Sequence, residues 1–566
     1  MPSPGLERPC VSEGGRVATN GRSGISAQMA FLNSDDTVIF LDKTENNPLQ
    51  INGRPAWASE YNIRTGKSKP FDIVTNTFCA GGAPIADGRM VVTGGNIAVG
   101  PKGLAANQSV GPYFSIDGGM AVNIWNPRDG TWDSRPRGLH RERWYPSMEP
   151  LADGSVAIIG GQSGGGYSAI EKLMEPTLEF FPDRGAPVPV PIITRTLPIN
   201  LYPLTYLMSN GRMFIQSYNE AVLYDLSAHT EQKLPDKPGA PGPYPSNAAV
   251  TLLPFTPDNK YEETVLFCGG LTGLSKVDWG GTHGPNVSLT DKSNSRDCWS
   301  IAPLIDATWR PRPPAPEGRS MATFITLPDG KIAWIGGAKK GTAGYGPPGS
   351  TGQPIGHSYA DDPGYAVWVL DPTRYTWSYE GTLSKPRMYH SSMVLMPDGS
   401  IVVGGSNPNP DVTTVKYPTE YSIEVWYPPW YITPRPSNAQ LPTTFSYGSS
   451  GFRIDLTKAR SANSTASITK ATVRLIRTGF STHAVQWGQR AIELNCRITN
   501  GSSTLVVDGL PNNRSLFAPG TALAFLDIDG VPSKGKFVQV GPKTIPGERR
   551  KKKKRRMEWS DGAKLF

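Results

Sequence analysis

The stretch RMYHSSMVLMPDGSIVVGGSN, residues 387–407, contains two apolar runs that are joined by a Pro-Asp-Gly turn and followed by a Gly-Gly break. This pattern predicts a β-hairpin, because the turn residues favour a tight reversal and the apolar runs have the composition of strands. Two looser copies of the pattern lie at residues 31–42 and 244–270. Four clearer copies, each with an Asp-Gly or Asn-Gly turn, begin at Cys79, Tyr145, Tyr202 and Gly318.

Seven copies with strands and Gly-Gly breaks predict an all-β protein with a β-propeller, in which each copy belongs to a four-stranded blade. Equivalent positions of the blades lie on a ring around the central axis. The residues eight or nine positions before each turn are therefore expected to meet at one mouth of the channel. These residues are Cys79, Tyr145, Tyr202, Tyr389 and His390.

The turns of neighbouring copies are widely spaced, for example 66 residues from Asp87 to Asp153. Long connections are therefore expected between the strands. The segments 100–112 and 339–365 are rich in glycine and are expected to be loops. Long loops on a rigid scaffold commonly cover a functional site.

A second domain is expected after the Pro- and aromatic-rich boundary at residues 426–438. Short strand-like runs from GFRIDL to KFVQVG follow it at the regular spacing of a β-sandwich. We therefore predict a propeller over residues 26–430 and an immunoglobulin-like β-sandwich over residues 435–542.

The two ends of the chain are expected to be disordered, over residues 1–25 and 543–566. The run MAFLNSDDTVIFLD, residues 29–42, is expected to close the propeller by pairing with the last blade. The C-terminal segment contains RRKKKKRR, which is read as a solvated extension, with a nuclear signal or a polyanion-binding patch as the alternative.

The formal net charge of +9 comes largely from that C-terminal segment. Without residues 548–566 the chain has 48 basic and 45 acidic residues, which leaves +3. The body therefore gives no reason to expect a nucleic acid partner. No apolar run approaches the roughly 18 residues of a membrane span, so no transmembrane segment is expected. We expect a monomer.

Five cysteines are present, and Cys268 and Cys298 are expected to form a disulfide across a 30-residue loop. Two buried, reduced thiols are the alternative. The first 25 residues lack the apolar stretch of a signal peptide. An extracellular location is nevertheless expected, and it is compatible with five Asn-x-Ser/Thr sites, at Asn107, Asn286, Asn463, Asn500 and Asn513.

Six histidines are present, and an isolated histidine such as His229 or His283 is usually a polar residue rather than a metal ligand. His390 differs because it stands at the ring position beside Tyr389. Two imidazoles with two phenolates suit a tetragonal Cu(II) site by ligand type. Aromatic packing around the channel is the alternative for Tyr145 and Tyr389.

Eight motifs occur in an order that resembles the fungal glyoxal oxidases, members of the copper radical oxidase family that includes galactose oxidase. The resemblance covers about residues 24–541 and implies a seven-bladed kelch-type propeller, followed by a sandwich domain whose loop supplies one copper ligand. The motifs are FCAGGAP, RWYPS, NLYPLTYL, KKGTAGYG, SYADDP, RMYHSSMVLMPDGSIVVGGSNPNP, TGFSTHA and DIDGVPS.

The resemblance also implies a role for each matched residue. Cys79 in FCAGG would be joined by a thioether to Tyr145 in RWYPS, and Tyr145 would bind copper and carry the radical. Tyr389 would be the axial tyrosine and His390 the adjacent ligand. His483 in STHA would be the ligand from the second domain. The implied cofactors are one copper ion and the Cys-Tyr radical.

This chemistry needs two one-electron acceptors, because copper accepts one electron and oxidation of an aldehyde or alcohol releases two. The implied mechanism uses Tyr389 as the base for the substrate proton, and a phenol with a pKa of about 10 needs a metal to serve in this way. Tyr145 then takes the hydrogen from carbon, and O2 leaves as H2O2. Aldehydes react as their hydrates.

One difference from galactose oxidase concerns the substrate. That relative has a tryptophan after the Gly-Gly break that follows the radical tyrosine, whereas Ser163 stands here. We therefore expect small aldehydes such as glyoxal or methylglyoxal as substrates, and not galactose. A copper alcohol oxidase and a non-catalytic kelch interaction module are the alternatives. Trp144, Tyr202 and Trp487 are read as packing residues, with a role in shaping the pocket as the alternative.

Overall fold

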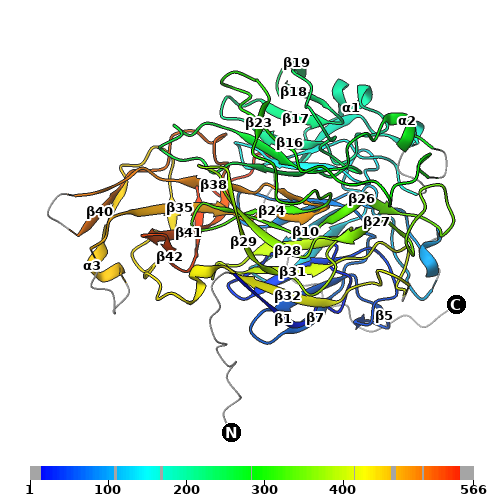
Figure 1. The fold of residues 1–566 in the computed structure, drawn as a ribbon, viewed down its shortest axis with the longest axis horizontal. Coiled ribbons are helices and arrows are strands. Elements are labelled where there is room, and N and C mark those ends of the chain that lie inside the picture. Colours follow the sequence, from blue (N-terminus) through cyan, green and yellow to red (C-terminus); the bar gives the residue numbers. More distant parts are fainter. Residues whose placement is uncertain are drawn as a thin grey trace, which may run out of the picture.

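The computed structural model describes residues 15–106, 111–165, 170–281, 284–413, 415–460, 467–499 and 503–547. Strands make up 41% and helices 4% of the structure, which confirms the predicted all-β class (Figure 1). No helix in these ranges is long and apolar enough to cross a membrane.

Seven four-stranded antiparallel units account for most of the strands in these ranges. The first strand of each unit is almost wholly buried. The first three units are β2 (Met29–Leu32), β3 (Thr37–Leu41), β6 (Ala58–Asn62) and β7 (Lys67–Phe71); β8 (Gly81–Pro84), β9 (Met90–Thr93), β10 (Val122–Asn126) and β11 (Thr131–Arg135); and β12 (Ser147–Pro150), β13 (Val156–Ile159), β14 (Thr177–Phe181) and β15 (Val188–Pro189).

The remaining four units repeat this arrangement. They are β16 (Leu204–Leu207), β17 (Met213–Ser217), β18 (Glu220–Asp225) and β19 (Thr230–Leu234); β20 (Ala249–Leu252), β21 (Val265–Cys268), β22 (Cys298–Ile301) and β23 (Arg310–Arg312); β24 (Thr323–Thr326), β25 (Ile332–Ile335), β28 (Ala366–Asp371) and β29 (Thr376–Thr382); and β30 (Ser391–Leu395), β31 (Ile401–Gly405), β32 (Ser422–Tyr427) and β1 (Arg16–Arg22).

One backbone feature is common to all seven units. The residue one or two positions before the first strand has a positive φ, between +45° and +63°. Some of these residues are also linked, since the amide of Tyr145 donates to the carbonyl of Cys79 at 3.0 Å and the amide of Tyr202 donates to that of Tyr145 at 3.1 Å. We call them the seven entry positions: Ala27, Cys79, Tyr145, Tyr202, Asn247, Met321 and His390.

The start of the chain corrects two predictions. Residues 16–22, expected to be disordered, form β1, and β1 rather than residues 29–42 pairs with β32 of the last unit. Residues 29–42 instead supply β2 and β3 of the first unit. The sequence RVATNGR is short and largely polar, because it forms an exposed edge strand. It therefore lacks the apolar alternation by which a strand is recognised in a sequence.

The glycine-rich segment 339–365 corrects a third prediction. It is not entirely a loop, because β26 (Ala338–Tyr345) and β27 (Ser358–Pro363) pair in an antiparallel ladder. Glycine is tolerated there because Gly341 and Gly344 have φ angles of +77° and +114°, which irregular pairing requires.

The C-terminal region forms two further sheets, which lie to one side of the seven units in Figure 1, coloured yellow to red. This agrees with the expected second β domain. The larger sheet has β33 (Thr444–Phe445), β43 (Lys536–Val540), β41 (Gly520–Ile528), β35 (Ala471–Arg477) and β38 (Arg490–Glu493), with β42 (Val531–Pro532) beside β41; the smaller has β34 (Phe452–Asp455), β40 (Thr504–Val507) and β39 (Cys496–Ile498).

One hairpin of this region leaves its own sheets. β36 (Phe480–Thr482) and β37 (Val485–Trp487) extend the first unit, because β36 pairs with β2 in the register Met29↔Thr482. The hairpin therefore carries residues 483 and 484 into the middle of the seven units.

The predicted disulfide is confirmed: Cys268 and Cys298 are bonded. They stand opposite each other on the neighbouring strands β21 and β22, which explains why a 30-residue separation can be bridged. Cys79 and Cys496 are free thiols, and Cys10 lies outside the described residues.

Candidate functional site

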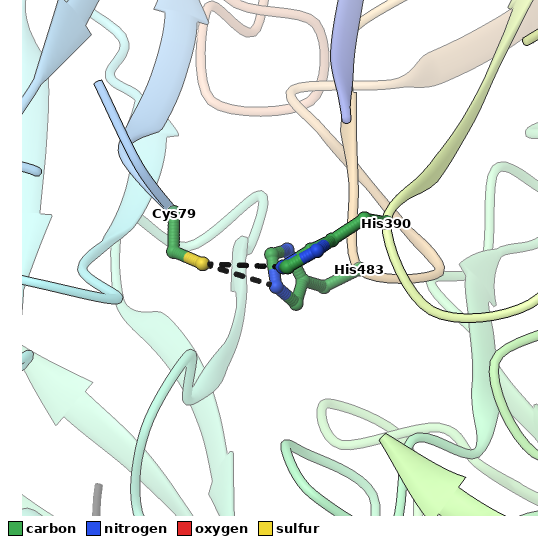
Figure 2. Close-up of side chains that lie close together, drawn as sticks. All are labelled: Cys79, His390 and His483. Atoms are coloured by element: carbon green, nitrogen blue, oxygen red, sulfur yellow. Dashed lines mark hydrogen bonds between the residues drawn. The ribbon is translucent and has the colours of Figure 1, made fainter. Parts of the chain in front are cut away.

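The structure brings together the five side chains that the sequence analysis assigns to the site. Cys79, Tyr145 and His390 occupy entry positions, Tyr389 directly precedes His390, and His483 lies at the turn of the β36–β37 hairpin. None of the five is more than 3% exposed. Figure 2 shows the sulfur of Cys79 directed at the rings of His390 and His483, which come from different parts of the chain.

The polar atoms of these residues form one compact cluster. The Sγ atom of Cys79 lies 3.3 Å from Nε2 of His483 and 3.6 Å from Nε2 of His390. The phenol oxygens of Tyr145 and Tyr389 are 2.8 Å apart, and Tyr389 Oη is 3.3 Å from His483 Nε2. Two imidazole nitrogens, two phenol oxygens and one sulfur thus face a common centre.

Hydrogen bonds behind the rings fix the orientation of both histidines. Nδ1 of His390 donates to the carbonyl of Asn407 at 2.7 Å, so its Nε2 is left as the acceptor facing the centre. Nδ1 of His483 lies 2.7 Å from Oγ1 of Thr482. The carbonyl of His483 accepts a hydrogen bond from the side chain of Asn247, another entry position. Such outer partners set the direction and basicity of metal-binding imidazoles.

Burial determines the protonation of the site. It lowers the pKa of His483 to about 3 and holds the pKa of His390 well below its usual range, with the neighbouring His483 as the next cause. Burial also raises the pKa of Tyr145 and Tyr389 well above 10. The imidazoles are therefore neutral and able to act as ligands, whereas the phenols need a nearby cation before they ionise.

This donor set fits a copper ion. Two neutral imidazole nitrogens and two phenol oxygens are the N and O ligands that Cu(II) prefers in tetragonal geometry. Within the described ranges, Cys79, His390 and His483 form the one group of three or more His, Cys, Asp or Glu side chains whose ligand atoms lie within 4.8 Å of one another. A cation among the phenols would also compensate for the cost of ionising them in a buried site.

A cavity of about 410 Å³ opens onto the two phenols. Its walls are aromatic rings, prolines and glycines, and His357 is the one residue with an ionisable side chain other than tyrosine. Besides Tyr145 and Tyr389, it is lined by Phe78, Trp144, Tyr244, Gly344, Tyr345, Gly346, Pro347, Pro348, His357, Tyr359 and Pro410. Part of the segment 339–365 thus covers the site.

Sequence reasoning missed most of these walls. Tyr244 lies 4.7 Å from Tyr145 between ring centroids, and its only sequence signal is its place in the looser copy at 244–270. Tyr345 and His357 come from a segment with no repeat pattern, so nothing in the sequence indicates where their side chains lie.

The three aromatic residues considered earlier have different positions. Trp144 lines the cavity, and its ring centroid lies 4.8 Å from that of Tyr145. Its side chain also acts on the Cys79 thiol, because burial raises the pKa of that thiol and a hydrogen bond from Trp144 is among the contributions that lower it. Tyr202 instead donates to the carbonyl of Ala80 at 3.0 Å, and Trp487 packs behind Tyr202 at 6.0 Å. Neither lines the cavity.

Other candidate residues lie apart from this cluster or outside the described part of the chain. Ser163 Oγ donates to the carbonyl of Leu173 at 3.3 Å. Cys79 is a free thiol and is not bonded to Tyr145 in the structure. His229 is exposed, beside Tyr224. The predictions for His283, for Asn107, Asn463 and Asn500, and for the basic run fall outside the described residues.

Two family models match almost the whole described chain. The model described as "Glyoxal oxidase N-terminus" matches residues 32–430, and "Galactose oxidase-like, Early set domain" matches residues 435–540. The chain is 26% identical to "Aldehyde oxidase GLOX1" of Arabidopsis thaliana over 513 residues, covering 84% of this chain and 74% of that protein. It is also 26% identical to "Aldehyde oxidase GLOX" of Vitis pseudoreticulata over 556 residues, covering 92% and 96%.

A solved structure has a similar fold. It is a fungal alcohol oxidase in complex with copper, which matches with a TM-score of 0.66 at 18% identity and covers 94% of this chain and 100% of its own. At this identity the match concerns the fold alone.

Proposed function

The chain belongs to the glyoxal oxidase family of copper radical oxidases, and on this premise we propose that it oxidises small aldehydes such as glyoxal and methylglyoxal to carboxylic acids, with reduction of O2 to H2O2. The observation that carries the proposal is the cluster of two Nε2 atoms and two phenol oxygens beneath an aromatic cavity.

Copper would be held by Tyr145, Tyr389, His390 and His483. Bound there, it would accept one of the two electrons and lower the pKa of the coordinated phenols. The radical cofactor would be a Cys79–Tyr145 thioether, whose formation replaces one S–H and one ring C–H by a C–S bond and passes two electrons and two protons to O2. The position of the Cys79 thiol beside Tyr145 supports this assignment, because Tyr145 contributes a hydrogen bond that acts on the thiol.

The protein's own side chains would then act in order. The aromatic walls of the cavity, among them Trp144, would orient the aldehyde hydrate. Tyr389 Oη, as a phenolate, takes the proton from the substrate hydroxyl. Tyr145, 2.8 Å away, takes the hydrogen from carbon. The close spacing of the two phenols means that one substrate carbon can present its O–H to one and its C–H to the other.

We further propose that the seven units close into a kelch-type propeller, which β1 extends from the predicted residues 26–430 to residues 16–430, and that residues 435–542 form an immunoglobulin-like sandwich. The seven entry positions with a shared left-handed backbone support a ring of equivalent units. The Cys268–Cys298 disulfide supports an extracellular location, since such bonds persist in oxidising compartments.

An alcohol oxidase with the same copper chemistry is the second candidate. The size of the cavity favours it, because about 410 Å³ exceeds what a two-carbon aldehyde fills. The solved structure of similar fold is also that of an alcohol oxidase.

The test is a peroxide assay on copper-loaded, oxidised protein with aldehydes, primary alcohols and galactose. Fastest peroxide release with glyoxal or methylglyoxal is expected. A preference for alcohols would favour the second candidate, and bound copper with no peroxide from any substrate would point to a non-catalytic kelch protein. Peptide mass spectrometry should find the peptides of Cys79 and Tyr145 joined with loss of two hydrogens. Alkylatable Cys79 in active protein would contradict the thioether.

A further inference from the structure

A buried ion pair lies behind the copper ligands and has no place in the chemistry described so far. Lys43 and Glu45 follow β3, and their side chains are 2% and 0% exposed. The ammonium nitrogen of Lys43 lies 3.6 Å from a carboxyl oxygen of Glu45. Taking two such groups out of water costs more than their attraction usually returns, so fold stability is a poor explanation for the pair.

Glu45 is connected to the ligand His390 through one residue. The side-chain amide of Asn407 donates to both carboxyl oxygens of Glu45, at 3.0 and 2.9 Å. The main-chain carbonyl of Asn407 is the group that accepts from Nδ1 of His390. The main-chain N–H of Asn407 donates to the main-chain carbonyl of Tyr389 at 2.9 Å. Glu45 thus fixes the residue that orients His390.

The same segment supports the loop that carries Cys79. The hydroxyl of Thr77 donates to the carbonyl of Asp42 at 2.7 Å. The side chain of Asn76 accepts from the amides of Thr44 and Phe78, at 3.0 and 3.2 Å. Residues 42–45 therefore contact both the residues that precede Cys79 and the residue that orients His390.

The ammonium of Lys43 lies close to the centre itself. It sits 5.4 Å from the ring centroid of Phe78 and 5.3 Å from that of Tyr345, two walls of the cavity. The Phe78 ring is in turn 5.5 Å from that of His390. One aromatic ring thus separates the cation from a copper ligand, and in a buried site a charge acts over such a distance with little screening.

Hydrogen bonds hold the segment that carries the pair in place. Asp42 accepts hydrogen bonds from Ser26, Gln28 and Asn47. The ammonium of Lys43 donates to the main-chain carbonyl of Asn409. The cation therefore keeps a fixed place beside the rings of Phe78 and Tyr345.

We propose that the Lys43–Glu45 pair tunes the copper centre: Glu45 orients His390 through Asn407, and the ammonium of Lys43 raises the reduction potential of the centre. The physical reason for the second effect is that reduction adds negative charge, which a nearby cation stabilises. Both are positioning residues rather than catalytic ones. The proposal rests on the proposed function only in taking copper as the bound metal.

The first test is Lys43→Met, with Lys237→Met as the matched control. Lys237 is also buried, also donates to a main-chain carbonyl, that of Ala240, and also lies over an aromatic ring, that of Phe267 at 5.3 Å. The readout is a redox titration of the copper-loaded protein followed by its visible and EPR spectra. We expect Lys43→Met to shift the one-electron equilibrium at least tenfold towards the oxidised state, about 59 mV lower. The control should match the wild type.

The second test is Glu45→Gln, with Glu263→Gln as its control, since Glu263 is also buried and both of its carboxyl oxygens also accept hydrogen bonds, in this case from the main-chain amide and the hydroxyl of Ser209. Copper affinity measured by calorimetry should fall about 10- to 100-fold for Glu45→Gln only, as found for outer-shell partners of metal ligands. If Lys43→Met fails to fold, Lys43→Gln removes the same charge but keeps a polar donor near the carbonyl of Asn409, and it should show the same lowered potential.

The outcomes separate the two proposals. A wild-type protein that binds no copper, or binds it and releases no peroxide, would contradict the proposed function. A wild-type oxidase whose potential and copper affinity are unchanged in the Lys43 and Glu45 variants would overturn this inference and leave the proposed function standing.

Discussion

The entry positions of the seven units have the same backbone and different side-chain chemistry. Cys79, Tyr145 and His390 have φ angles of +52°, +63° and +63° and contribute polar atoms to the candidate site. Ala27 and Met321 have φ angles of +52° and +59° and contribute no polar side chain. A left-handed backbone at a non-glycine residue costs about 1–3 kcal/mol and is often taken as a mark of a functional site.

This comparison shows that the strain belongs to the repeat and not to catalysis. All seven units bear the same cost, whereas only some entry positions carry a reactive side chain. Asn247 lies between the two groups, because it donates to the carbonyl of His483. The repeat thus supplies seven positions with the same backbone conformation, and the identity of the side chain decides which of them contribute to the site.

The largest effect is expected when Tyr145→Phe is compared with Met321→Leu. Loss of the Tyr145 phenol removes the proposed radical carrier, so peroxide release should fall by more than the roughly 10⁴-fold that loss of a general base can cost. Met321→Leu replaces one buried apolar side chain by another and should cost less than about 1.5 kcal/mol of stability. Steady-state assays and urea unfolding measure the two effects. Comparable turnover in the two variants would remove the functional distinction.

A smaller loss of turnover is expected for Tyr389→Phe, at the residue next to the entry position His390. The proton acceptor disappears, but Tyr145, His390 and His483 remain to hold copper. Turnover should fall about 10²- to 10⁴-fold with copper stoichiometry unchanged. Metal analysis and peroxide assays on one preparation check both statements. Full turnover with bound copper would show that another group takes the substrate proton.

The buried His483 can be compared with the exposed His229 by varying the pH. Burial lowers the pKa of His483 to about 3, while an imidazole in an unfolded chain titrates near 6.5. Between these values the unfolded state binds the additional proton, so the free energy of unfolding of copper-free protein should fall as pH is lowered from about 6.5 towards 3. Protonation of this imidazole in the unfolded state lowers the free energy of unfolding by about 5 kcal/mol as the pH approaches 3.

Urea unfolding of copper-free protein at several pH values measures this loss. His483→Gln should have a flatter profile than wild type, because one of the two buried imidazoles is gone and His390 remains. His229→Gln, at an exposed position, should retain the wild-type slope. Identical slopes in all three proteins would show that the hairpin imidazole is not buried in solution.

The smallest effect tests the strain itself. Ala27→Gly removes one methyl group but relieves a left-handed backbone, so stability should change by less than about 0.5 kcal/mol. Ala333→Gly, equally buried but within the regular strand β25, should cost about 1 kcal/mol or more because nothing is relieved. Thermal unfolding compares the two. Equal losses would mean that the entry positions are not strained.

The sequence predicts the repeated part of the molecule better than its exceptions. The turn chemistry around Asp398 recurs, so the hairpins and the convergence of Tyr145 with His390 follow from the period. The position of His483 depended on family resemblance, because its hairpin leaves the sheets of its own domain. The stretch containing Lys43 and Glu45 reads as a solvated turn, since charged residues are usually exposed. Only tertiary packing buries it.

The pairing of β36 with β2 joins Met29 to Thr482, which is synthesised more than 400 residues later. A growing chain contains Cys79, Tyr145 and His390 long before His483 leaves the ribosome. On the ligand assignment proposed above, the complete copper set cannot exist before residue 483 has been synthesised, and it forms only when the β36–β37 hairpin has docked. On the same assignment, metal uptake and the proposed cross-link follow that docking, and a chain that stops before His483 would release no peroxide.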